Sequence, residues 1–134
     1  MRSSVLGLVV GAAGVVVLAS CGNSTYGTGG GGGGGGCMPT ATKVCLTASL
    51  TFNPATLNIP AGTQVTWQNG SAITHTVTSS SSSTESFSSG NIGGAGSFVH
   101  TFSTQGTFPY YCMIHGADVG GVPSGMHGTI TVTP

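Results

Sequence analysis

Charged side chains are almost absent from this 134-residue chain, which has two Lys or Arg and two Asp or Glu residues. A chain without a basic patch has no electrostatic footprint for nucleic acid, so no nucleic-acid partner is expected. Helical periodicity is also missing. Low charge accompanies disorder when hydrophobicity is low too, but 38% of these residues are apolar, which is enough for a core. The length suggests one domain, or one domain with appendages.

The first apolar run is short for a membrane span, which needs roughly 20 such residues. Arg2 precedes an apolar stretch at residues 5–18, as in a secretory signal peptide. The stretch ends in Leu18-Ala19-Ser20-Cys21, which resembles the lipobox of bacterial lipoproteins. The resemblance implies that residues 1–20 are removed and that Cys21 is lipidated. The chain would then be extracytoplasmic, anchored to a bacterial membrane and facing the periplasm or the cell exterior. An ordinary signal peptide or an uncleaved anchor is the alternative.

A glycine-rich segment follows at residues 21–36, with an unbroken run from Gly29 to Gly36. Such a segment cannot bury apolar surface and behaves as a flexible coil. Its root-mean-square reach is roughly 20 Å. We therefore expect a domain at residues 37–134 on a tether.

Short segments rich in β-branched and aromatic residues alternate with turns from Cys37 onward. Asn69-Gly70 is a strong turn signal, and the serine- and glycine-rich stretch 79–96 is expected to be a long surface loop. The predicted strands cover residues 44–52, 56–59, 63–68, 73–78, 97–102, 107–112 and 129–133. This spacing predicts an all-β sandwich. The expected core aromatic residues are Phe52, Trp67, Phe102, Phe108 and Tyr110.

Four residues have the chemistry of a copper site. Cys112 lies three residues before His115, Met126 follows in the same region, and His75 lies upstream. Two imidazoles and a thiolate with a weak axial thioether are the blue-copper ligand set. Cu(I) favours the sulfur ligands and Cu(II) accepts imidazole, so such a site suits both oxidation states.

The order of these motifs resembles the cupredoxins, especially those of the plastocyanin and pseudoazurin type. The resemblance covers nearly all of the expected domain. It rests on residues 52–69 and on three motifs: Thr74-His75-Thr76-Val77, Tyr111-Cys112-Met113-Ile114-His115 and Met126-His127-Gly128-Thr129-Ile130-Thr131-Val132.

The resemblance implies a Greek-key β-sandwich of about seven to eight strands with one copper ion (Cu⁺/Cu²⁺), held by His75, Cys112, His115 and Met126. The implied function is single-electron transfer between a redox donor and an acceptor, by a monomer that is not an enzyme.

One departure from the family pattern concerns the axial ligand. Ten residues, 116–125, separate His115 from Met126, where the plastocyanin type has only a few. Four glycines and a proline in this insertion would let it bulge and still return Met126 to the site. A backbone carbonyl, His127 or no axial ligand at all are the alternatives.

The remaining cysteines suggest a disulfide. An extracytoplasmic location permits disulfides, and Cys37 with Cys45 is the natural pair. A second metal site is the rival, but no His or carboxylate lies near them in sequence. Pairing either with Cys112 is formally possible and would destroy the copper site.

Three neighbouring residues carry weaker expectations. Thr76 stands where the family often has Asn or Ser, whose hydrogen bond ties the two ligand loops together. Tyr111 lies either on an electron route or simply in the packing. His100 shares a face with Phe98 and Phe102 and is expected in the core or on the sheet surface.

Two alternative functions for this chain are compatible with the same fold. A periplasmic copper carrier or buffer would have the same ligands, and a metal-free adhesion domain would need none. The single cysteine in the ligand loop argues against a binuclear copper centre, and the single domain argues against oxidase or nitrite reductase activity. An apolar docking face is expected around His115, formed by Gly116, Ala117, Val119, Val122 and Pro123.

Overall fold

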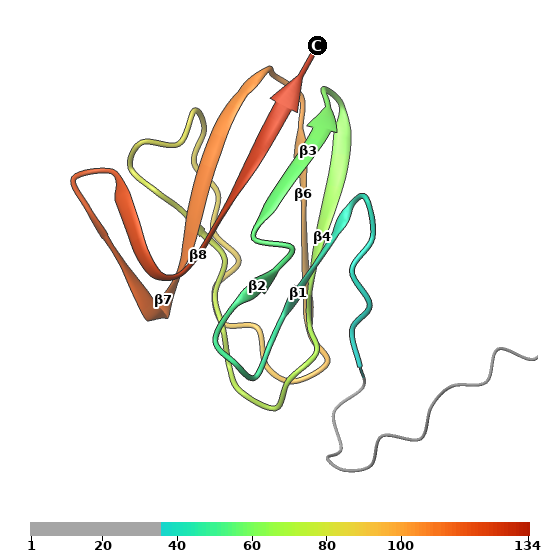
Figure 1. The fold of residues 1–134 in the computed structure, drawn as a ribbon, viewed down its shortest axis with the longest axis vertical. Coiled ribbons are helices and arrows are strands. Elements are labelled where there is room, and N and C mark those ends of the chain that lie inside the picture. Colours follow the sequence, from blue (N-terminus) through green and yellow to red (C-terminus); the bar gives the residue numbers. More distant parts are fainter. Residues whose placement is uncertain (1–35) are drawn as a thin grey trace, which may run out of the picture. The chain divides into compact units, whose positions relative to one another are not determined.

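The computed structural model describes residues 36–134, which fold entirely into strands and loops. Eight strands follow in chain order (Figure 1): β1 Lys43–Leu46, β2 Phe52–Asn53, β3 Thr56–Pro60, β4 Thr63–Asn69, β5 Thr78–Ser79, β6 Ser97–Phe102, β7 Gly106–Val119 and β8 Val122–Thr133. No helix in this part of the chain is long and apolar enough to cross a membrane.

The strands form two four-stranded sheets. One has the order β2-β1-β4-β6 and the other β3-β8-β7-β5. β1 with β4 and β3 with β8 pair in parallel, and the remaining neighbours are antiparallel. The predicted all-β, two-sheet fold is confirmed.

Alternating side chains from both sheets form the core. In β4, Val65, Trp67 and Asn69 are buried while the residues between them are less so. Trp67 is fully buried, and its ring lies 5.5 Å from that of Tyr110 in the other sheet. The five aromatic residues predicted for the core are all buried.

Two predicted strands were too long. The segment 44–52 contains a turn, in which the N–H of Leu50 bonds to the Thr47 carbonyl, so it splits into β1 and β2. The segment 73–78 contains only the start of β5. Its polar residues pair irregularly instead: His75 exchanges two backbone hydrogen bonds with Ile92, at 3.1 and 2.7 Å. This anchors the later part of the 79–96 loop, at Ile92, beside His75.

The ten-residue insertion extends the β7–β8 ladder as a hairpin. Gly116 pairs with Gly125 and Val119 with Val122, and Gly120-Gly121 form the turn. Both turn residues have positive φ, 61° and 83°, which is the type I′ geometry that glycine permits. The orange-red end of this hairpin extends beyond the sheets (Figure 1).

Cys37 and Cys45 form a disulfide with a Cα–Cα distance of 5.7 Å. It fastens the start of the described chain onto β1, as the sequence predicted. The signal segment 1–20, the lipidation residue Cys21 and nearly all of the tether lie outside the described residues.

Candidate metal centre

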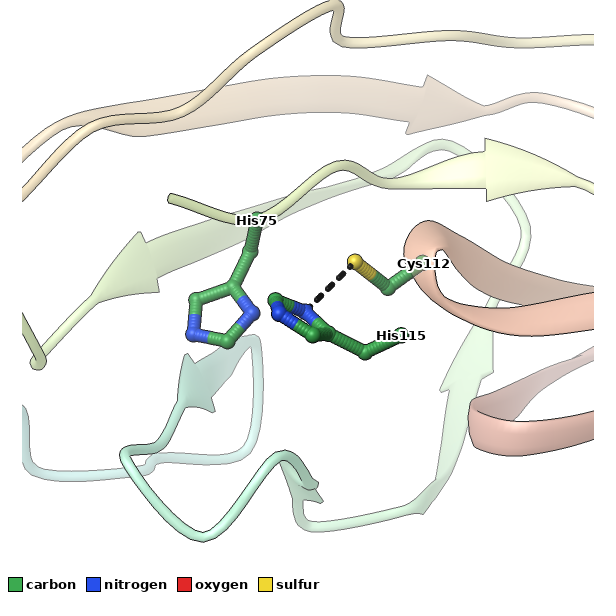
Figure 2. Close-up of side chains that lie close together, drawn as sticks. All are labelled: His75, Cys112 and His115. Atoms are coloured by element: carbon green, nitrogen blue, oxygen red, sulfur yellow. Dashed lines mark hydrogen bonds between the residues drawn. The ribbon is translucent and has the colours of Figure 1, made fainter. Parts of the chain in front are cut away.

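The side chains of three predicted ligands lie close together. The candidate ligand atoms of His75, Cys112 and His115 all lie within 4.8 Å of one another. Figure 2 shows the two imidazole rings and the sulfur directed toward a common point. The ring centroids are 5.0 Å apart, and His115 Nδ1 lies 3.4 Å from Cys112 Sγ. His75 and Cys112 are fully buried, whereas His115 is partly exposed.

A large bulge in the β7–β8 ladder presents two of these ligands. Tyr111 pairs with His127, and the next pair is Gly116 with Gly125. The stretch from Cys112 to His115 therefore faces the single residue Met126. A bulge of this kind bends the strand and redirects its side chains. It brings Cys112 and His115, three residues apart, into contact.

Met126 is 2% exposed and lies opposite this bulge. The insertion thus returns Met126 to the base of the hairpin, opposite the stretch of β7 that contains Cys112 and His115. His127, one of the alternatives for the axial position, is exposed, and its Nδ1 lies 2.8 Å from the Gly125 carbonyl.

A buried hydrogen-bond network orients the His75 ring. Asn69 Nδ2 donates to the carbonyls of Ile73 and Ile92, at 2.7 and 3.0 Å. Asn69 Oδ1 must therefore be an acceptor, and it receives the Ser71 N–H and lies 2.8 Å from the Ser71 hydroxyl. The Ser71 hydroxyl proton lies toward Asn69 Oδ1 or, at 3.3 Å, toward the Ile73 carbonyl, and in both cases Ser71 Oγ accepts from His75 Nε2, 3.2 Å away.

This network determines which nitrogen of His75 is free. If Nε2 carries the proton, Nδ1 of the neutral ring has a lone pair. His75 Nδ1 is buried and has no hydrogen-bond partner among the described residues. Burial and the neighbouring His115 lower the pKa of His75, which keeps the ring neutral. A buried acceptor without a donor is costly, so this site fits a metal ion.

Thr76 links the two segments that carry the ligands. Its hydroxyl accepts the N–H of Met113 at 2.8 Å, and its own N–H donates to Cys112 Sγ at 3.3 Å. The expected tie between the ligand loops is therefore present. This N–H holds the Cys112 sulfur in place, and cysteine binds metal as the thiolate.

Other histidine and methionine side chains lie away from this centre. His100, half-buried on β6, pairs with Glu85, and its ring stacks on Phe87. Met113 is 60% exposed. The sequence interpretation missed Ser71 and Asn69, because Asn69-Gly70 was considered only as a turn. The polar residues before His75 were the available signal.

Comparisons with known proteins agree with this geometry. Residues 40–133 match the model of the copper-binding proteins of the plastocyanin/azurin family. No curated protein matched the chain. A purple cupredoxin from Nitrosopumilus maritimus is 25% identical, with a TM-score of 0.55 over 69% of this chain and 99% of that one.

Two further solved structures share the fold. A Cu(I) mutant of amicyanin is 22% identical, with a TM-score of 0.56 over 68% of this chain and 80% of that one. A Cu-containing nitrite reductase from Thermus scotoductus SA-01 is 24% identical, with a TM-score of 0.59; the match covers 73% of this chain and only 23% of the reductase. The family match extends over most of the chain and includes the His75, Cys112 and His115 cluster, whose donors suit one copper ion. This chain belongs to the copper-binding plastocyanin/azurin family.

Proposed function

We propose that this protein carries single electrons between extracytoplasmic redox partners, using one copper ion bound by His75, Cys112, His115 and, axially, Met126. The observation that carries the proposal is Nδ1 of buried His75, which has no hydrogen-bond partner within residues 36–134; the candidate ligand atoms of His75, Cys112 and His115 lie within 4.8 Å of one another. Copper at such a site alternates between Cu(I) and Cu(II), both of which a mixed thiolate and imidazole set accommodates.

The surroundings of the cluster favour electron transfer. Ser71 holds the His75 ring, and Thr76 ties Cys112 to the loop that ends at His115. Ligands held in place by the protein move little when the metal changes charge. His115 is the partly exposed member of the cluster and is the natural point of electron entry and exit.

The surface near His115 suits an apolar partner. Four large apolar side chains of the ligand loop and the hairpin are exposed: Met113 60%, Ile114 49%, Val119 75% and Val122 68%. With so few charges in the chain, association should lack strong steering and depend weakly on salt. Lipidation of Cys21 would hold the domain on its glycine-rich tether at a membrane, which keeps it close to membrane-bound partners. Partner on-rates that collapse as salt rises would contradict this docking mode.

Copper binding to the full-length chain tests the ligand assignment. We expect added Cu(II) to give an intense thiolate-to-copper band in the visible spectrum. Cys112→Ser should abolish the band, and Met126→Leu should keep it while shifting the reduction potential. An identical trace for the wild type and Cys112→Ser would disprove the site. An unchanged potential in Met126→Leu would leave Met126 outside the coordination sphere.

Voltammetry and metal transfer then separate electron transfer from copper carriage. An electron carrier should give a reversible wave at a positive potential with fast self-exchange, and should retain its copper in both oxidation states. Ready release of Cu(I) to a chelator, with slow self-exchange, would instead indicate a periplasmic copper carrier or buffer.

A further inference from the structure

The hairpin inserted between His115 and Met126 is held at its far end by a polar contact. The carboxylate of Asp118, on β7, accepts three hydrogen bonds from the loop after β5. They come from the Ser80 hydroxyl at 3.0 Å, the Ser81 N–H at 2.7 Å and the Ser81 hydroxyl at 2.8 Å. Ser82 Oγ donates to the Gly121 carbonyl in the turn at 2.6 Å. We call these contacts the Asp118 clamp.

The loop that receives the hairpin is itself fixed to the sandwich. The Ser80 N–H donates to the Pro109 carbonyl at 2.8 Å, within the buried half of β7, and Ser80 is only 4% exposed. The turn also lies close to the loop, since a Cβ added at Gly121 would stand 2.8 Å from Ser82 Cβ. The clamp therefore attaches the hairpin to a rigid part of the fold.

The near end of the hairpin lies against the ligands. A Cβ at Gly116 would stand 2.5 Å from the Ser124 carbonyl oxygen, 3.1 Å from that of Met126 and 3.2 Å from that of Cys112. The two strands thus pair closely at two glycines, Gly116 and Gly125, which have no side chains. Glycine restricts the backbone least, so this base by itself does not set the direction of the hairpin.

We propose that Asp118 is a positioning residue of the copper site, which holds the hairpin so that His115 and Met126 keep their places. The hairpin, residues 116–125, connects His115 directly to Met126. A change in the direction of the hairpin would therefore displace both residues. The proposal rests on the proposed copper site. It assigns a role to one of the few charged residues of the chain and to the serine run that the sequence interpretation treated as a solvated loop.

Copper release from the full-length protein tests the proposal. Asp118→Ala should release copper to a chelator about tenfold faster than the wild type. This is the lower end of the effect on metal affinity that is typical when a residue supporting the ligands is removed. It should also shift the thiolate-to-copper band and the copper hyperfine splitting. Ser82→Ala, which loosens the same clamp from the loop side, should change these readouts in the same direction but less.

Ser124→Ala is the matched control on the same hairpin, because within the described residues the Ser124 hydroxyl makes only a 3.5 Å contact, with the Ala117 carbonyl. It should behave as the wild type. The proposal would be overturned if Asp118→Ala speeds exchange of the Ser81 amide hydrogen but leaves the spectra and the rate of copper release unchanged. The clamp would then stabilise the hairpin without positioning the ligands. If the wild-type protein shows no thiolate-to-copper band, the proposed copper site itself is wrong. This result needs no variant, so it is distinguished from a failure of the Asp118 proposal.

Discussion

The two halves of the β7–β8 pair differ in how they are held. Before the bulge, Phe108 and Tyr110 on β7 and Ile130 and Val132 on β8 are buried between the sheets. Beyond it, Val119 and Val122 are 75% and 68% exposed, and the strands are held by Asp118 and serine hydroxyls. The same two strands thus pass from an apolar core to a polar attachment, and the ligand loop lies at the junction.

This contrast indicates that the two halves of the strand pair have different roles. Burial of apolar surface supplies the stability of the inner half, while directional hydrogen bonds position the outer half. A site at the junction can have its ligands held on one side by the core and an exposed face on the other.

The largest expected effect comes from the inner half. Phe108→Ala removes a fully buried ring and should lower the free energy of unfolding by about 3–5 kcal/mol. Val119→Ala, on the outer half, should change it by no more than about 0.5 kcal/mol. Denaturant unfolding of the full-length apoprotein measures both. Equal losses would contradict the contrast between the halves.

The next effect concerns the network that holds His75. Ser71→Ala leaves the His75 Nε2–H and the Ile73 N–H without their common acceptor, which should cost about 1–3 kcal/mol of stability. Copper affinity should fall by about 10- to 100-fold. Competitive copper titration measures this loss, and Ser124→Ala again serves as a control. Affinity unchanged in Ser71→Ala would show that Ser71 does not orient the ring.

Crowding at the junction predicts an effect of similar size. Gly116→Ala places a methyl group 2.5 Å from a backbone carbonyl, so the strands must separate, at a cost of about 1–3 kcal/mol. Gly93→Ala, which meets nothing within 4 Å, is the control. Because Gly116 follows His115, only the former variant should alter the copper spectrum. A normal spectrum with full stability would show that the base of the hairpin is not tightly packed.

The smallest effect is the pH dependence of the clamp. The Ser81 N–H, followed by the hydroxyls of Ser81 and Ser80, lowers the pKa of the Asp118 carboxyl below its ordinary 3.8. A carboxylate with a lowered pKa stabilises the fold above its unfolded pKa, and this stability is lost as the pH falls through the folded pKa. The stability difference between the wild type and Asp118→Asn should therefore be full at neutral pH, begin to fall as the pH approaches 3.8, and vanish only below the lowered pKa of the folded protein.

Taking the difference between these two proteins removes the contribution of the histidines, which both share. Apoprotein unfolding measured across this pH range provides the test. A difference that stayed constant with pH would show that the Asp118 charge is not linked to folding.

Much of this protein could be predicted from local patterns. Strand alternation indicated the two-sheet fold, because side chains on opposite faces of a strand need opposite environments. The types and order of His75, Cys112, His115 and Met126 indicated copper, because ligand chemistry depends on residue type. The pairing of Cys37 with Cys45 was expected because they were the two cysteines without another assigned role.

Other features were decided only by the tertiary structure, because they depend on residues far apart in sequence. The serine run could have been a free loop, and its role at Asp118 exists only because β5 and β7 are neighbours. Ser71 became a partner of His75 only because the fold places its hydroxyl between Asn69 Oδ1 and His75 Nε2. The insertion became a hairpin because its two glycines at the turn and two at the base let the strands continue to pair. The sequence by itself thus determined the candidate ligands and the class of fold, and the tertiary structure decided what holds those side chains in place.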